Sequence, residues 1–193
     1  MCSSDLVRIH QSDRPDDEIC LLFGRNPGRM ERVQGETLDT TQATPARLSV
    51  FDAPLDPESI TAAMRENLDD ELTEVKSENA IDRITSQANP RTLERVPAGA
   101  RFRTRFVMDL LCEEDAPLFP RVLEGIRLLE DDALGGGGSR GSGRVSFSNL
   151  RLVWRGRKYY AAGAPEKEIG AGATVSAIQT AVTNSAFSFL HEE

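Results

Sequence analysis

The residues best suited to chemistry lie in a glycine-rich stretch, Leu134 to Phe147, with the sequence L-G-G-G-G-S-R-G-S-G-R-V-S-F. Glycine adopts positive φ angles without a steric penalty, so successive backbone N–H groups of such a loop can converge on one anion. Arginine side chains nearby can donate charge-assisted hydrogen bonds to phosphate oxygens. The stretch therefore predicts a phosphate-binding loop, with the candidate residues Gly135, Gly136, Gly137, Gly138, Ser139, Arg140, Gly141, Gly143 and Arg144.

Two other interpretations apply to the same stretch. It lacks the lysine and the spacing of a nucleotide-binding P-loop, G-x-x-x-x-G-K-[ST]. A run rich in glycine and serine is also typical of a flexible linker. The two arginines, and the helix-like and strand-like segments on either side, favour contact with a polyanion over a linker.

A second stretch, Glu71 to Gly99, predicts a long projecting β-hairpin. Two β-capable arms, 75–85 and 92–96, flank a polar tip at 86–91, where Asn89-Pro90 favours a turn. Such a hairpin could hold a nucleic-acid backbone and insert an apolar side chain, Ile81 or Ile84, between bases. A solvated loop with scattered charge pairs is the alternative. The basic candidates are Lys76, Arg83, Arg91 and Arg95.

The elements that hold these stretches follow from hydrophobic periodicity. The pattern predicts strands at 47–52, 101–111 and 144–154, and helices at 57–68, 116–130 and 175–190. In the second strand Arg101, Arg103 and Arg105 share one face, and they alternate with Phe102, Thr104 and Phe106 on the other. These arginines could stack on bases, or they could be the solvated side of a sheet.

Composition narrows the class of protein. The chain has 193 residues and a net charge of −8, yet residues 76–158 hold 15 basic and 11 acidic residues, a local excess typical of nucleic-acid binding. No run of 18 apolar residues and no signal peptide is present, so we expect a cytoplasmic protein with no membrane partner. Cys2, Cys20 and Cys112 predict reduced thiols, and Cys2, His10 and Cys20 do not match the spacing of a zinc site.

Two separated stretches resemble one family. E-V-K-S-E-N-A-I-D-R-I-T-S-Q-A-N-P-R-T-L-E-R-V-P-A-G-A-R-F, residues 74–102, resembles the thumb hairpin of the RAMP-type backbone subunit of type III CRISPR effector complexes, in the Csm branch. L-E-D-D-A-L-G-G-G-G-S-R-G-S-G-R-V-S-F, residues 129–147, resembles the glycine-rich loop of that subunit. I-C-L-L-F-G followed by R-L-S-V-F-D-A-P-L resembles the segment before the thumb. The resemblance covers roughly residues 17–155.

The resemblance implies an α+β fold with a ferredoxin-like, RRM-like RAMP core and a protruding thumb. It also implies that copies stack along a guide CRISPR RNA in antiviral defence, that each thumb inserts between guide and target RNA, and that the loop holds guide phosphates. The implied partners are guide RNA, target RNA, further copies of the chain and other subunits of the complex. We expect an irregular segment at 1–46, a core at 47–160 with the thumb at 71–99 and the loop at 134–144, and a C-terminal extension at 161–193.

The chain departs from the family pattern before Cys20. Family members begin there with a strand, a glycine loop and an acidic loop that holds a catalytic aspartate. We therefore expect an incomplete N-terminal part, as in a fragment, a split-gene product or a true variant, and a guide-RNA binding function that survives better than cleavage. A generic RRM-like binding or scaffold module without nuclease activity is the alternative, although no aromatic K/R-G-F-G-F-V-x-F signature is present.

The resemblance also bears on catalysis. The family cleaves target RNA with a divalent cation such as Mg²⁺, whereas RNA binding needs no cofactor. Glu74, Glu78 and Glu94 match acidic positions near the family's cleavage centre, and carboxylate oxygens suit Mg²⁺. They are auxiliary candidates only, because the aspartate loop has no counterpart here, and no residue is assigned as catalytic.

Overall fold

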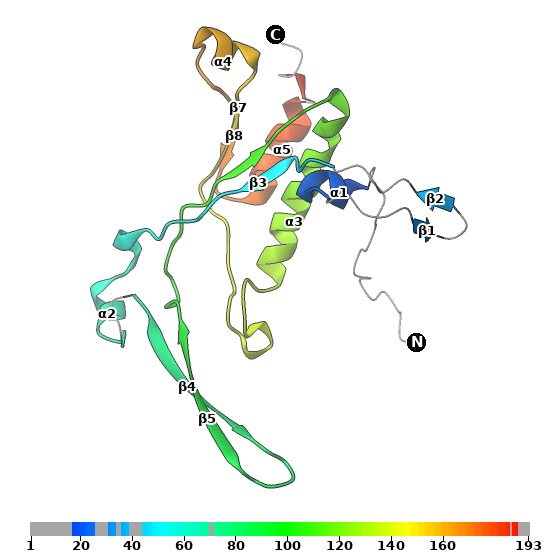
Figure 1. Cartoon of the computed structure of the whole chain (residues 1–193). Coiled ribbons are helices and arrows are strands. Elements are labelled where there is room, and N and C mark those ends of the chain that lie inside the picture. Colours follow the sequence, from blue (N-terminus) through cyan, green and yellow to red (C-terminus); the bar gives the residue numbers. More distant parts are fainter. Residues whose placement is uncertain are drawn as a thin grey trace, which may run out of the picture. The chain divides into compact units, whose positions relative to one another are not determined.

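The computed structural model describes residues 17–25, 31–33, 36–38, 44–69, 72–185 and 187–188 (Figure 1). The chain forms two compact units, one from residues 1–48 and 108–193 and the other from residues 49–107. Helices and four small two-stranded sheets make up the described part, so the predicted α+β class is confirmed. The ferredoxin-like arrangement of the core stays a prediction. None of the described helices has the length and apolar character needed to cross a membrane.

The first unit contains most of the helices (Figure 1). Two short 3-10 turns, η2 and η3, precede and follow its longest helix. Its elements are α1 (Glu18–Phe23), β1 (Glu31–Val33), β2 (Glu36–Leu38), η2 (Glu113–Leu118), α3 (Phe119–Asp131), η3 (Gly138–Arg140), β7 (Leu150–Trp154), α4 (Arg157–Ala162), β8 (Lys167–Gly172) and α5 (Val175–Ser185). Helices α3 and α5 confirm two of the three predicted helices.

The main core of this unit lies between α3, α5 and the β7–β8 sheet. Val175, Ile178 and Val182 recur at helical spacing on α5 and are each 3% exposed, and they pack with Leu123 of α3. Phe147, Leu150 and Leu152, apolar residues of the strand expected at 144–154, pack against this cluster. The segment that we expected to be a C-terminal extension thus supplies one strand and one helix to the core.

A buried carboxylate fixes the start of α3. Asp115 in η2 is 2% exposed, and it accepts hydrogen bonds from the backbone N–H groups of Leu111 (2.9 Å) and Cys112 (3.2 Å). The Nε of Arg47 lies 3.2 Å from its other oxygen. Burial works to raise the pKa of Asp115, but the two N–H donors and the Arg47 charge together lower it below the usual value. A smaller core of Leu22, Leu118 and Val122 adjoins this turn.

The second unit carries the predicted hairpin. Strands β4 (Glu74–Ile81) and β5 (Ala88–Arg95) pair antiparallel, and η1 (Pro57–Ser59) and α2 (Ala62–Arg65) precede them. The hydroxyl of Ser59 donates to the carbonyl of Asp56 (2.6 Å) and accepts from the N–H of Arg101 (2.9 Å), so it ties together the segments before and after the hairpin. Strands β3 (Leu48–Val50) and β6 (Phe106–Met108) form a further two-stranded sheet.

Three predicted elements are shorter than expected. The helix at 57–68 is divided into η1 and α2, because Ile60 is extended and the Thr61 side chain caps a new helix. The strand at 101–111 is reduced to β6, since the N–H groups of Arg101 and Arg103 bond to Ser59 and Pro54 instead of a regular ladder. The strand at 144–154 begins only at Leu150.

Candidate nucleic-acid interface

The glycine-rich stretch forms a loop with a closed neck. The N–H of Leu134 donates to the carbonyl of Gly143 over 2.8 Å, so the two ends of the loop meet. Inside the loop the carbonyl of Gly137 accepts from the N–H groups of Arg140 (2.9 Å) and Ser142 (3.2 Å), and the N–H of Gly141 donates to Gly138 (2.9 Å). These bonds, with η3 at the far end, give the loop a defined conformation of its own.

Glycine is required at particular loop positions. Gly135, Gly137, Gly141 and Gly143 have φ angles between 78° and 83°, a region that L side chains rarely adopt. At Gly143 an added Cβ would also overlap the carbonyl oxygen of Leu134. Gly136, by contrast, has an ordinary φ and open space around it. The glycines therefore allow the loop to keep one defined backbone conformation. A binding loop needs such a conformation, whereas a linker does not.

This loop carries several exposed donor groups. In the described part of the chain, no hydrogen bond engages the backbone N–H groups of Gly135 to Gly138, and these residues are mostly exposed. Arg140 and Arg144 are exposed on the same loop, and none of the described carboxylates forms an ion pair with Arg144. Adjacent N–H groups and two guanidinium groups are donors that suit phosphate oxygens. The loop therefore combines backbone and side-chain donors within a short stretch of chain.

The hairpin register places most of the charged side chains of its strands on one face. Glu74 lies opposite Arg95, Lys76 opposite Leu93, and Glu78 opposite Arg91. Directly opposed residues of an antiparallel pair point to the same side, and side chains alternate along each strand. One face of the hairpin therefore carries Glu74, Lys76, Glu78, Arg91 and Arg95, while the other carries Val75, Ser77, Asn79, Ile81, Thr92 and Glu94.

Glutamates pair with most of the basic candidates on that face. Glu78 is 2.9 Å from Arg91 and 3.8 Å from Lys76, and Glu74 pairs with Arg95. These pairs stand on the surface, where each contributes little to stability and is screened by salt. The charged face is thus nearly balanced, and a phosphate there must compete with the carboxylates for the same cations.

The tip of the hairpin differs from the predicted one. The turn spans 82–87, where the Asp82 side chain accepts from the N–H groups of Ile84 and Thr85, each at 2.8 Å. These bonds lower the pKa of Asp82, the backbone bond from Thr85 contributing most. Asn89 and Pro90 lie inside β5, so the prediction of a tip at 86–91 was wrong. A two-stranded ribbon tolerates this proline because each strand is an edge strand.

The true tip presents one cation and one apolar side chain. Ile84 is 94% exposed, and Arg83 beside it has no ion-pair partner among the described residues. Of the four basic candidates on the hairpin, Arg83 is therefore the one that no described carboxylate engages. An exposed isoleucine with a neighbouring guanidinium suits contact with an unstacked base and its phosphate.

The three glutamates do not converge on one point. Glu94 lies opposite Val75 and so points to the other face from Glu74 and Glu78, which already pair with arginines. In the described ranges no group of three metal-ligating side chains is close enough to hold a cation. The three glutamates stay auxiliary candidates, and as they stand they do not together form a Mg²⁺ site. Of the residues considered for zinc, Cys2 and His10 lie outside the described residues.

The arginines after the hairpin have separate local partners. Arg101 lies 3.5 Å from a carboxylate oxygen of Asp56, and the guanidinium of Arg105 stacks 4.9 Å from the centre of the Phe51 ring. The N–H of Phe51 donates to the carbonyl of Arg105 (3.0 Å), which holds the two residues side by side. The Arg105 plane is thus occupied by a ring of the protein. The sequence pattern could not show the stacking of Arg105 on Phe51, because it contains no information on the pairing of residues 49–56 with 101–107.

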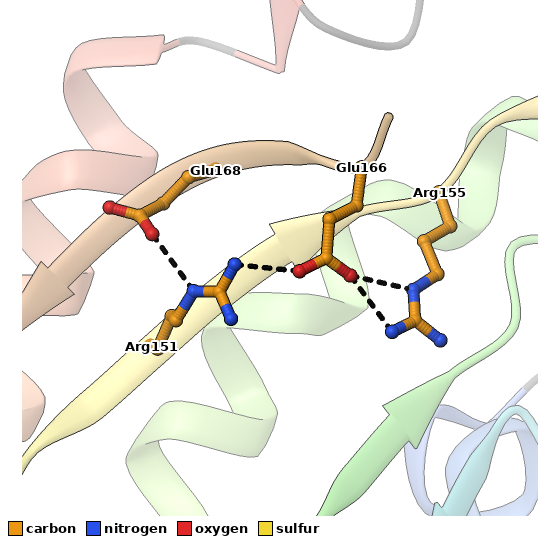
Figure 2. Close-up of polar contacts among 4 residues, drawn as sticks. All are labelled: Arg151, Arg155, Glu166 and Glu168. Atoms are coloured by element: carbon orange, nitrogen blue, oxygen red, sulfur yellow. Dashed lines mark hydrogen bonds and ion pairs between the residues drawn. The ribbon is translucent and has the colours of Figure 1, made fainter. Parts of the chain in front are cut away.

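Sequence reasoning missed one cluster, at the closed end of the β7–β8 hairpin. Glu166 binds both Arg151 (2.6 Å) and Arg155 (2.8 Å), and Glu168 binds Arg151 (2.8 Å), as Figure 2 shows. These carboxylates raise the pKa of both arginines, and the arginines lower the pKa of Glu166. The sequence shows the tryptophan and both tyrosines at 154–160 among basic residues, but it does not show the ion pairs, because these depend on the register of β7 and β8.

Comparisons with known proteins place this geometry in a family. The chain is 41% identical over 63 residues to the CRISPR system Cms endoribonuclease Csm3 of Methanocaldococcus jannaschii. The matched segment covers 33% of this chain and 25% of that protein. It is 36% identical over 84 residues to the protein of the same name from Methanothermobacter thermautotrophicus. This match covers 44% of this chain and 34% of that protein. The matches therefore span a quarter to a third of the length of these relatives.

A solved structure is similar over more of the chain. The Csm3–Csm4 subcomplex of the type III-A CRISPR–Cas interference complex contains a chain that superimposes with a TM-score of 0.56 at 25% identity, covering 89% of this chain and 68% of that one. A family model described as the RAMP superfamily matches residues 6–146. The resemblance found in the two sequence stretches is confirmed by these matches, and the chain belongs to the RAMP superfamily.

Proposed function

We propose that this chain is a backbone subunit of a type III CRISPR interference complex that binds guide CRISPR RNA and contributes to target-RNA recognition in antiviral defence. Two relatives are named as a Csm3 endoribonuclease of a CRISPR system, which supports the proposal. The similar solved chain comes from a subcomplex of Csm3 with Csm4, which supports assembly with other subunits, and the proposal extends this to further copies of the chain. The partners proposed on this basis are a guide RNA, a target RNA and those subunits.

The glycine-rich loop is the observation on which the proposal chiefly depends. Its neck is closed by Leu134 and Gly143, and it presents the N–H groups of Gly135 to Gly138 together with Arg140 and Arg144. Backbone N–H groups contact phosphate without reading sequence, which is what a subunit that binds any guide requires. The ligand of the loop is accordingly a repeating phosphate backbone, one contact for each copy of the chain.

The hairpin tip suits a separate role, which is contact with the paired guide and target RNA strands. Ile84 is almost fully exposed, and Arg83 beside it is engaged by no described carboxylate. Insertion of an apolar side chain between base steps unstacks them at a cost of a few kcal/mol, which phosphate contacts offset. We assign the contact between guide and target RNA to this tip, with Lys76, Arg91 and Arg95 available only when RNA displaces their glutamates.

Target-RNA cleavage is not part of this assignment. Glu74 and Glu78 are engaged by arginines, and Glu94 points to the other face of the hairpin. A cleavage centre that used them would need a different arrangement of these side chains. The binding role stands on residues that the structure brings together, and we rank it above a nuclease role for this chain.

The test is a salt series of RNA affinity. The full chain is titrated into a fluorescent guide CRISPR RNA, and the dissociation constant is measured at several salt concentrations for the parent and for the double variant Arg140→Ala, Arg144→Ala. Loss of two phosphate contacts to single-stranded RNA should weaken binding and flatten the slope of log K against log salt by about 1.4. Arg127→Ala removes another exposed arginine of the same unit and serves as the control.

Three outcomes separate the interpretations. A parent chain whose RNA affinity does not depend on salt has no phosphate interface, and the proposal fails. If the control shows half the effect of the double variant, which removes twice the charge, the binding belongs to net charge and not to the loop. Copy number distinguishes the generic RRM-like alternative, because a backbone subunit should occupy a long guide at regular intervals whereas an isolated module binds once.

A further inference from the structure

The closed end of the β7–β8 hairpin lies outside the segment matched by the family model, which ends at residue 146. Five basic and two acidic side chains lie between Arg151 and Glu168, a net charge of +3 in a chain whose net charge is −8. Helix α4 forms this end, and Gly163 ends the helix in the left-handed conformation. The end of the hairpin is thus a basic and aromatic surface within an acidic protein.

Ion pairs hold the two strands below this end in register. In Figure 2 Glu166 lies between Arg151 and Arg155 and bonds to both, with two bonds to Arg155 at 3.0 and 2.8 Å. Both acidic residues of the segment are consumed in these pairs. Three further basic residues lie on and beside α4, and they are Arg157, Lys158 and Lys167.

The same network positions an exposed aromatic ring. The Arg155 guanidinium lies 5.0 Å from the centre of the Tyr159 ring, and the Tyr159 and Tyr160 rings meet edge to face at 5.0 Å and 84°. Tyr159 is half-buried by these contacts, whereas Tyr160 is 72% exposed. Tyr160 is therefore oriented by a chain of contacts from Glu166 and still presents its ring to solvent.

Arg157 stands three residues before Tyr160, so the two side chains are neighbours on one side of α4. No described carboxylate pairs with Arg157, and its side chain is exposed. Arg157 and Lys158 occupy the first turn of the helix, where the peptide dipoles disfavour cations.

We propose that this surface, Arg157 and Tyr160, is an additional contact for single-stranded RNA, with a base stacked on Tyr160 and its phosphate bound by Arg157. Stacking on an exposed ring beside cations is the chemistry by which proteins hold single strands without reading sequence. Alanines follow Tyr160 in α4, so the surface offers too little apolar area for a membrane. The inference rests on the proposed function only in taking RNA as the ligand.

The experiment uses the full chain and fluorescence anisotropy with a single-stranded RNA. Tyr160→Ala should weaken binding roughly tenfold, because stacking of one base contributes about that much, and Tyr160→Phe should bind like the parent since the ring is retained. Arg157→Ala should weaken binding and lower the salt dependence, whereas Arg127→Ala should do neither. Circular dichroism melting checks that the exposed substitutions leave the fold unchanged.

A crosslinking measurement gives an independent result. RNA that contains 5-iodouridine is irradiated with the full chain, and stacked bases should attach to the tryptic peptide at 159–167, within which fragmentation should assign the adduct to Tyr160. If Tyr160→Ala and Arg157→Ala bind RNA like the parent while the Arg140, Arg144 double variant binds weakly, this inference is wrong and the proposed function stands. A parent chain that binds no RNA overturns both.

Discussion

The backbone N–H of Leu134 donates to the carbonyl of Gly143 over 2.8 Å, and this bond converts a glycine-rich run into a closed loop. Gly143 is confined at this point, since its φ is 82° and an added Cβ would overlap the Leu134 carbonyl. Glycine-rich sequence alone does not distinguish a linker from a binding loop. The closed neck does, because a linker gains nothing from a bond between its ends.

Gly143→Ala should open this neck. The left-handed conformation costs alanine about 1 kcal/mol or more, and the overlap with Leu134 adds to it, so the Leu134 amide should exchange with solvent at least fivefold faster. Amide hydrogen exchange followed by mass spectrometry measures this directly. Gly136→Ala is the matched control, because its Cβ meets nothing within 4 Å and its φ is ordinary, and it should leave the exchange unchanged. Equal exchange in the two variants would show that the neck does not depend on Gly143.

Glu78→Gln should strengthen RNA binding if the charged face of the hairpin contacts RNA. The substitution releases Arg91 and Lys76 from their shared carboxylate, so we expect roughly threefold higher affinity and a steeper salt dependence. Anisotropy titrations at several salt concentrations measure both quantities. Glu94→Gln changes the net charge by the same amount on the opposite face and provides the control. If both variants gain equally, the effect comes from overall charge, and the charged face has no special role.

The hairpin shows which features of the candidate site can be predicted from the amino-acid sequence. Its two arms and its basic residues follow from composition and β propensity, and the structure confirms a long antiparallel pair. Its register does not follow, because it depends on a turn set by the Asp82 side chain, whereas Asn89-Pro90 was the stronger turn signal. A wrong tip shifts every cross-strand pair, so the pairing of Arg91 with Glu78 could not be foreseen.

The helices were easier to predict than the strands, for a related reason. Helix α5 is set by its own apolar positions, Val175, Ile178 and Val182, which face one cluster. The strand expected at 101–111 depends instead on partners far away in the sequence, and there Ser59 and Pro54 accept its first N–H groups. The ion-pair network around Glu166 has the same character, since it joins residues that only the β7–β8 register brings together.

Ile178→Ala should show that residues 161–193 are part of the core. Ile178 is 3% exposed between α5 and its neighbours, so truncation should lower the free energy of unfolding by about 2–5 kcal/mol. Urea unfolding followed by the fluorescence of Trp154 reports on this unit, because Trp154 lies in β7. Leu128→Ala, at a side chain that is 63% exposed, should change the free energy by less than about 0.5 kcal/mol. A small effect at Ile178 would mean that α5 is only loosely attached.

Asp115 should make the stability of the first unit depend on acid pH. Its pKa in the folded chain is lowered, because hydrogen bonds from Leu111 and Cys112 and the charge of Arg47 outweigh the effect of burial. A carboxyl group with a lowered folded pKa contributes stability above its unfolded pKa of about 3.9, and this contribution is lost as pH falls through the lower folded value. Between those two values stability should therefore rise with pH.

Asp115→Asn tests this relationship. The variant should lose about 3 kcal/mol at neutral pH, since Arg47 keeps a mostly buried charge without its partner, and its stability should change less than that of the parent below about pH 4. Urea unfolding from pH 7 down to pH 3 gives both quantities. Glu113→Gln removes an exposed carboxylate from the same turn and should preserve the acid dependence of the parent. An unchanged acid profile in Asp115→Asn would assign the loss of stability below pH 4 to other carboxylates.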